Sequence, residues 1–191
     1  DGYIYYNDQP GGLSAEITGL NHEGSGDFTQ DMFTLSTGTK ADAVSFTSGG
    51  VPYLVQTRTV IDADVAIDNK NSKYTFKTDD IELNNLKLSA GGFFQLINDS
   101  TYGMDITFKT PSNDFKDILS LIPAIYKTDF DKLKTEGKAA LEGFVKGTYS
   151  PQQMPAYDVK LQVDNGFFQY PDLPKPVRNI QINLQASNPD G

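Results

Sequence analysis

The chain has 191 residues, and its 25 acidic and 16 basic side chains give a net charge of −9. So acidic a protein repels phosphate backbones and anionic headgroups, which argues against nucleic-acid binding and electrostatic membrane docking but leaves contact with lipid tails open. The absence of cysteine excludes disulfides, thiolate nucleophiles and cysteine-based metal sites.

Apolar and polar residues alternate along much of the chain, which predicts strands that face water on one side only. The clearest case is residues 60–68, where Ile61, Val65 and Ile67 share one face and aspartates occupy the other. The same alternation recurs in residues 104–108, 159–163 and 180–184. Twelve phenylalanines and ten tyrosines also favour strands over helices.

Turn-forming residues separate these runs. Asp68–Ser72 predicts a hairpin between the alternating runs 61–67 and 74–76. At Asn84-Asn85 the alternation slips by one residue, which predicts a β-bulge. Further turns are expected at Gln9–Gly12, Ser48–Gly50 and Asp164–Gly166.

One stretch has helical spacing. Phe115, Ile118 and Leu119 follow a capping segment, and Pro123 should end or kink the helix, so we expect it near residues 113–122. The expected fold is mainly β: a curved antiparallel sheet or β-groove of repeated strand–turn–strand units with this one short helix.

Three regions of one continuous structural unit are expected. Residues 1–110 form a β-rich repeat region, 111–127 a helical insert, and 128–191 a second β-repeat region. Residues 2–10 and 166–174 share the pattern Gly, two large residues, any residue, Tyr, any residue, Asp, any residue, Pro, which suggests an internal repeat. Chance similarity of two strand–turn segments is the competing explanation.

The sequence gives little support for a catalytic site or a metal-binding site. His22 is the only histidine and lies among polar residues, so a Ser–His–acid mechanism would depend on it alone. Asp62, Asp64, Asp68 and the pair at 79–80 are the candidates for calcium, but the EF-hand pattern fails, and the wet face of a strand explains them more simply. We therefore predict no enzyme activity, no metal and no cofactor.

In the C-terminal half, Gly, Asn and Pro residues recur between the alternating segments. A Gly-rich alternating segment at 137–147 leads to Val163-Asp164-Asn165-Gly166, then to Tyr170-Pro171 and a further strand at 177–184. This pattern resembles the AsmA-like family. The residues that carry the resemblance are Gly137, Gly143, Gly147, Asn165, Gly166, Tyr170 and Pro171.

The resemblance implies a segment of a longer protein, anchored in the inner membrane of a Gram-negative bacterium by a part not included here and facing the periplasm. It also implies a role in outer-membrane assembly or homeostasis, or in lipid transport, with lipid acyl chains as partners. The candidates for contact with lipid are Ile61, Val65, Ile67, Leu161, Val163, Ile180, Ile182 and Leu184.

Alternation alone leaves a second architecture open. A closed β-sandwich would bury the same side chains against a second sheet and would serve as a structural or interaction module without lipid.

Overall fold

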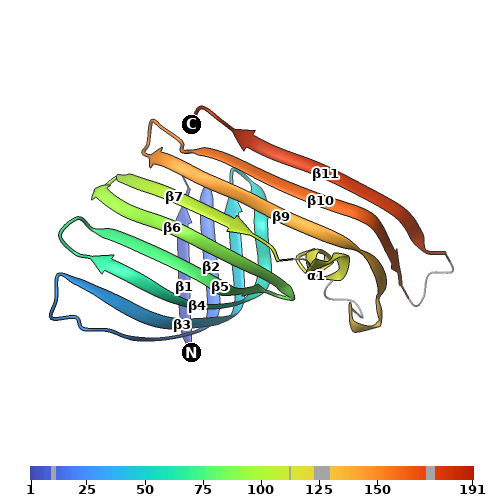
Figure 1. The fold of residues 1–191 in the computed structure, drawn as a ribbon, viewed down its shortest axis with the longest axis horizontal. Coiled ribbons are helices and arrows are strands. Elements are labelled where there is room, and N and C mark those ends of the chain that lie inside the picture. The colour runs from blue at the N-terminus through green and yellow to red at the C-terminus, as the bar shows by residue number, and fades with distance from the viewer. Residues whose placement is uncertain (10–11, 112, 123–129, 171–174) are drawn as a thin grey trace.

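The computed structural model describes residues 1–9, 12–111, 113–122, 130–170 and 175–191. It confirms a mainly β fold, with one open antiparallel sheet and one short helix (Figure 1). The strands are β1 (Gly2–Asp8), β2 (Leu13–Ser25), β3 (Met32–Ser48), β4 (Val51–Asp68), β5 (Lys73–Leu83), β6 (Leu86–Asn98), β7 (Thr101–Lys109), β8 (Asn113–Asp114), β9 (Lys134–Tyr149), β10 (Ala156–Gln169) and β11 (Val177–Asn188).

Strands adjacent in the sequence are also neighbours in the sheet, except around the helical insert. There β7 pairs with β9, and the two-residue β8 pairs with β9 off the main path. The two β-rich regions expected from the sequence therefore form one sheet, joined through pairs such as Ile106 with Val145. No second described sheet faces this one, which differs from the sandwich architecture.

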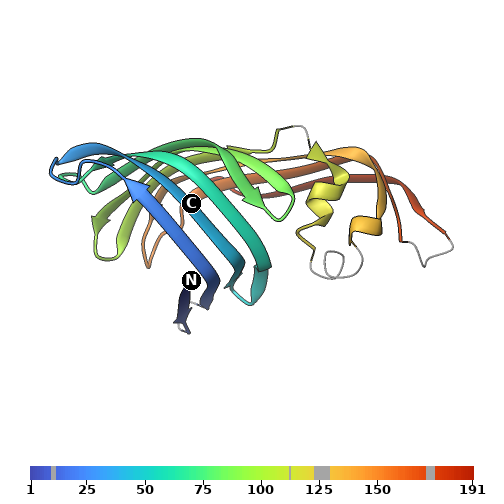
Figure 2. The same ribbon diagram turned by 90° about the horizontal axis from the view of Figure 1, so that it is seen from below.

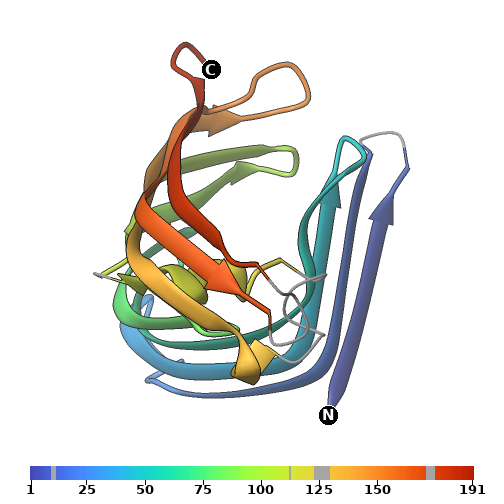
Figure 3. The same cartoon turned by 90° about the vertical axis from the view of Figure 1, so that its right-hand side faces the viewer.

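The sheet is strongly curved, and seen end-on it forms a trough (Figure 3). Irregular backbone positions interrupt the strand ladders on both sides of the trough. Gly19 in β2 has a φ of 63°, and a Cβ there would overlap the carboxylate of Asp42 in β3. Because bulges increase twist and bend a strand, such positions account for part of the curvature.

The helix α1 (Phe115–Leu119) lies inside the trough near one end (Figures 2 and 3). It is shorter than the expected helix at 113–122, because Asn113 and Asp114 form β8 instead. The Asp114 N–H donates to the Asp117 carboxylate at 3.1 Å, which holds the first turn. Ser120 is the C-terminal cap of the helix. After it, the N–H groups of Leu121 and Ile122 donate to carbonyls three residues earlier, those of Ile118 and Leu119. Pro123 lies outside the described residues.

The predicted hairpin at Asp68–Ser72 is confirmed, since Ile67 pairs with Tyr74 across it. The predicted bulge at Asn84-Asn85 is wrong. These two residues form a tight turn between β5 and β6, in which Leu83 pairs with Leu86 and Asn84 has a φ of 53°. Asparagine tolerates this left-handed conformation, and a two-residue reversal shifts the alternation just as a bulge would.

The expected turn at Asp164–Gly166 is also wrong, because β10 continues through it. Asn165 has a φ of 51°, and the register with β11 shifts between Val163 and Gly166, so these residues form a bulge inside the strand. The turn at Ser48–Gly50 is confirmed, with Gly49 and Gly50 in the left-handed region.

Candidate functional site: the apolar concave face

One cross-strand row of apolar residues runs across most of the sheet. Residues directly opposite one another in antiparallel strands project to the same face, so the strand register identifies the row. Its members are half-buried and are Leu35, Val65, Phe76, Gly92, Ile106, Val145 and Tyr157. We call these seven residues the apolar ladder.

A second apolar row lies two residues away along the strands. It comprises Phe33, Ile67, Tyr74, Phe94, Met104 and Gly147. Both rows lie on the face that α1 contacts, because the side chains under α1 follow the same alternation along β6, β9 and β10. The concave face of the trough is therefore the apolar face.

The opposite face is largely polar. The row adjacent to the apolar ladder contains Ser36, Asp64, Lys77, Thr107 and Asp158, with Gly91 and Phe144 between them. The Ser36 hydroxyl donates to the Asp64 carboxylate at 2.5 Å, and the Lys146 ammonium lies 3.0 Å from the Asp105 carboxylate. The two faces differ sharply in polarity, as the alternation in the sequence indicates.

At one end the concave face is covered. Phe115, Ile118 and Leu119 of α1, with Phe130 and Leu133 after the insert, pack onto β6, β9 and β10. Leu86 and Val163 beneath them have no exposed surface. This end is a hydrophobic core of ordinary kind.

A buried asparagine ties the helix to the sheet. The Asn84 side chain donates to the Ser120 carbonyl at 2.7 Å and accepts from the Arg58 N–H at 2.9 Å. The Asn85 N–H donates to the Ser120 hydroxyl at 3.2 Å. The turn between β5 and β6 thus fixes the C-terminal end of α1, and partial burial there raises the pKa of Asp117 above its ordinary value.

The residues predicted to contact lipid fall into two groups. Leu161, Ile180 and Ile182 pack against the core under α1, whereas Ile61, Val65 and Ile67 lie on the part of the face away from it. Within this second group Ile61 and Val65 are half-buried, but Ile67 is buried, with 8% of its surface exposed. Leu184 is 51% exposed. All eight candidates share the concave face, but only part of that face is open.

Val163 is a correction to the prediction. Its exposed fraction is zero because α1 covers it, so it is part of the core and not available to a lipid in this structure. Other ladder residues were absent from the predicted set, among them Phe76, Val145 and Tyr157. Short alternating runs around each of them were the available signal, but glycines at positions such as Gly92 and Gly147 dilute the apolar pattern.

The family-like glycines have specific contacts and do not lie in turns. Gly137, Gly143 and Gly147 all lie inside β9. Gly137 has a φ of 104°, and a Cβ there would lie 2.8 Å from the Asn165 carbonyl oxygen and from the Gly166 Cα. The bulge in β10 therefore needs a glycine opposite it, which explains why these motif residues occur together.

Two further motif residues complete the pattern. A Cβ on Gly143 would lie 2.7 Å from the Phe108 ring, so the aromatic side chain occupies the space above this glycine. The Tyr170 ring meets the Phe168 ring edge-on at 6.3 Å and packs against the core. Pro171 lies outside the described residues.

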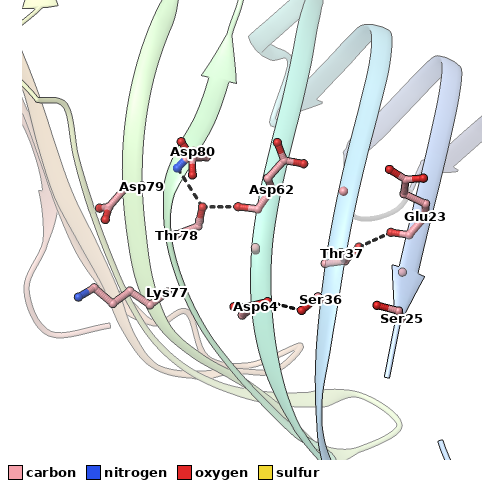
Figure 4. Close-up of a pocket in the computed structure, with 13 residues that line it drawn as sticks. Glu23, Ser25, Ser36, Thr37, Asp62, Asp64, Lys77, Thr78, Asp79 and Asp80 are labelled. Carbon is pink, nitrogen blue, oxygen red and sulfur yellow. Dashed lines mark hydrogen bonds between the residues drawn. The ribbon is translucent and has the colours of Figure 1, made fainter. Parts of the chain in front are cut away.

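A shallow hollow of about 820 Å³ over β2 to β5 is lined by four of the acidic candidates, Asp62, Asp64, Asp79 and Asp80 (Figure 4). Asp68 does not line it and bonds to Asn71 in the hairpin. The Thr78 hydroxyl donates to the Asp62 carbonyl at 2.5 Å, and the Asp80 N–H donates to that hydroxyl at 3.0 Å. Within the described ranges, no group of three or more His, Cys, Asp or Glu side chains is placed to hold a metal ion. The hollow is a polar surface of these strands.

His22 lies in the strand β2. It is exposed, and its Nδ1 lies 2.8 Å from the Thr39 hydroxyl and 3.4 Å from the Thr37 hydroxyl. Its described hydrogen bonds thus involve threonines on β3 and no carboxylate, which is a poor arrangement for a general base.

Comparison with known protein families, with curated proteins and with solved structures finds no match for this chain. Among the described residues, no helix has the length and apolar character needed to cross a membrane.

Proposed function

We propose that this chain is a non-enzymatic segment of a cell-envelope protein that contributes an apolar β-groove to lipid transport or outer-membrane assembly. The observation that carries the proposal is the apolar ladder, which crosses seven strands on the concave face, outside the cluster that packs under α1, and which no second described sheet faces. Contiguous exposed apolar surface of this kind typically marks an interaction site.

The geometry of the face suits acyl chains better than a compact ligand. The ladder is made of aliphatic and aromatic side chains with the small Gly92 near its middle, and it includes no charged residue. Acyl chains need apolar contact and no hydrogen-bond donors. The charged residues of the same strands project to the opposite face, where they would keep the segment hydrated.

The net charge of −9 is compatible with this role, because acyl-chain contact is driven by burial of apolar area and not by attraction to headgroups. The resemblance to the AsmA-like family supports placing the segment in the periplasm of a Gram-negative bacterium, with a membrane anchor elsewhere in the parent protein. Transport along an open groove would require no catalytic group.

The proposal is tested by lipid mass spectrometry on protein purified from the periplasm without detergent. The unmodified chain is expected to carry phospholipid or glycolipid in stoichiometric amounts. Val65→Asp combined with Ile106→Asp should remove it, because both carboxylates would enter the apolar ladder. Thr107→Asp is the matched control, since it adds a charge to the same strand on the polar face.

Two results would contradict the groove proposal. If the unmodified chain is free of lipid, or if the double variant retains lipid while the circular dichroism of both variants matches the parent, the groove proposal is wrong. The chain would then be better described by the second function considered, a scaffold that binds envelope proteins and holds no lipid.

A further inference from the structure

Three polar side chains on β2 and β3 interrupt the apolar character of the concave face. His22 pairs with Thr39, Thr39 pairs with Ile61 on β4, and the same row of pairs ends at Leu88 in the core under α1. Because residues opposite one another project to the same face, His22 and Thr39 lie on the concave face. Thr37, two residues earlier on β3, lies there too. We call His22, Thr37 and Thr39 the polar cluster.

The hydrogen bonds of the polar cluster orient the imidazole ring. The Thr39 hydroxyl lies 2.8 Å from Nδ1 of His22. The Thr37 hydroxyl donates to the Glu23 carbonyl at 3.1 Å (Figure 4) and lies 3.4 Å from each ring nitrogen. When Thr39 donates to Nδ1, the proton of the neutral ring is on Nε2. The exposed His22 then presents an N–H donor on the concave face.

Gly24 leaves space between the polar cluster and the apolar ladder. It pairs with Thr37 and therefore shares the concave face. A Cβ on Gly24 would lie 3.1 Å from Cδ1 of Leu35 and 3.7 Å from Nε2 of His22, so both groups border the space above the glycine. Leu35 is the first residue of the apolar ladder. A hydrogen-bond donor and the start of an apolar surface therefore lie side by side.

The concave positions around the polar cluster carry no Lys, Arg, Asp or Glu on β3 and β4. They are Phe33, Leu35, Thr37 and Thr39, paired with Ile67, Val65, Ala63 and Ile61. Glu23, Asp62 and Asp64 occupy alternate positions and project to the other face. Recognition here therefore depends on hydrogen bonding and apolar contact and not on an ion pair with these strands. This combination fits an amphiphile that carries acceptor oxygens at one end.

We infer that the polar cluster holds the polar end of a lipid whose acyl chain lies on the apolar ladder. The N–H at Nε2 of His22 donates to an acceptor oxygen, which is a phosphodiester or ester oxygen of a phospholipid or a carboxylate oxygen of a fatty acid. Thr39 is a positioning residue that holds the ring. The chain passes over Gly24 toward Leu35 and Val65. The inference rests on the proposed function and adds the position and direction of the bound lipid.

The test uses the fact that His22 is the only histidine, so its ring signals in a nuclear magnetic resonance spectrum need no assignment among histidines. Isotope-labelled protein is titrated with lauroyl lysophosphatidylcholine or with laurate, each below its critical micelle concentration. The ring signals report on the polar cluster, and the methyl signals of Val65 and Ile106 report on the apolar ladder. We expect the Nε2 signal to move over the same concentration range as the methyl signals.

The two probes distinguish the sources of the acceptor oxygen. Movement of the Nε2 signal with lysophosphatidylcholine alone assigns the site to phospholipid, and movement with laurate alone assigns it to fatty acid. Movement with both shows that the polar cluster accepts either polar end.

Variants separate the hydrogen bond from the apolar contact. His22→Leu should weaken binding of the probe about fivefold, because it removes the donor but keeps an apolar side chain. His22→Gln supplies an amide N–H and should retain most of the affinity. Thr39→Val should weaken binding less than His22→Leu does. Thr34→Val is the matched control and should leave binding unchanged, since Thr34 lies on the same strand and projects to the opposite face.

Movement of the Val65 and Ile106 methyl signals with a stationary His22 signal would overturn this inference and leave the proposed function standing. If none of these signals moves with either probe, the proposed function fails and the inference fails with it. Movement of the His22 signal alone, or equal affinity of the parent and His22→Leu, would also overturn the inference.

Discussion

The two ends of the concave face have the same sequence character and opposite environments. At one end Leu86 and Val163 are completely buried beneath α1, whereas residues of the apolar ladder such as Val65 and Ile106 remain half-exposed. Both sets come from alternating strands of similar composition. The difference comes from a short insert between β7 and β9, which covers one end only. The cover by α1, and not the strand pattern, separates Leu86 and Val163 from half-exposed ladder residues such as Val65 and Ile106.

The largest expected effect on stability comes from placing a charge at the covered end of the concave face. The same substitution at the open end is the comparison. Val163→Asp should lower the free energy of unfolding by about 3–5 kcal/mol, because the carboxylate would be buried without a partner. Ile106→Asp should cost much less, since its side chain can reach water. Urea denaturation of the two variants measures both values, and equal losses would show that the two ends do not differ in cover.

Removing the cover itself should have the next largest effect. Phe115→Ala should cost about 3–5 kcal/mol, because Phe115 is buried in the core under α1 and its loss leaves a cavity. The variant should also bind more of a fluorescent apolar dye than the parent. Unchanged dye binding in Phe115→Ala would contradict the role of α1 as a cover.

The link between α1 and the β5–β6 turn gives a smaller effect. Asn84→Gly keeps a residue that tolerates the φ of 53° but removes the side-chain hydrogen bonds to Ser120 and Arg58, and should cost about 1–3 kcal/mol. Asn85→Gly retains its backbone bond to Ser120 and should be nearly neutral. Thermal denaturation compares the two, and similar melting temperatures would remove Asn84 as an anchor.

Substitution of Gly137 tests the β-bulge of β10 beneath the covered end of the concave face. Gly137→Ala should be about 1–3 kcal/mol more destabilising than Gly50→Ala, although both positions have a positive φ. The reason is that a Cβ at Gly137 meets the backbone of Asn165 and Gly166, whereas at Gly50 no atom lies within 4 Å. Equal losses of stability would mean that backbone strain alone requires the glycine at Gly137.

The smallest expected effect concerns pH. Partial burial raises the pKa of Asp117 above its ordinary value, so the folded state binds a proton there more tightly than the unfolded state. The contribution of Asp117 to stability should therefore rise as pH falls through this raised pKa, and should level off below the unfolded value. Comparing Asp117→Asn with the parent across pH isolates this contribution, and parallel stability curves would contradict it.

The sequence predicted the strands well because apolar and polar residues that alternate with a period of two indicate a sheet with one solvent-exposed face. It predicted irregular positions less well. Asn84-Asn85 and Asn165-Gly166 have similar composition, yet the first pair reverses the chain and the second continues a strand through a bulge. The choice depends on partners distant in sequence, such as Gly137 opposite Asn165, which local pattern does not contain.

The candidate site was predicted in part for the same reason. Ile61, Val65 and Ile67 share the concave face as their alternation indicated, but alternation carries no information on what lies above that face. Val163 was assigned to the lipid-facing set because its strand resembles the others. Only the packing of Phe115, Ile118 and Leu119 onto it shows that it belongs to the core.

The central claim, that acyl chains occupy the open part of the concave face, is tested most directly by photo-crosslinking in cells. A photoreactive phenylalanine analogue is placed at Ile106 on the apolar ladder, at Thr107 on the polar face, or at Val163 under α1. We expect lipid adducts at Ile106 and none at Thr107 or Val163. Adducts absent at Ile106, or equally abundant at Thr107, would contradict the proposal that the apolar ladder is a lipid-binding surface.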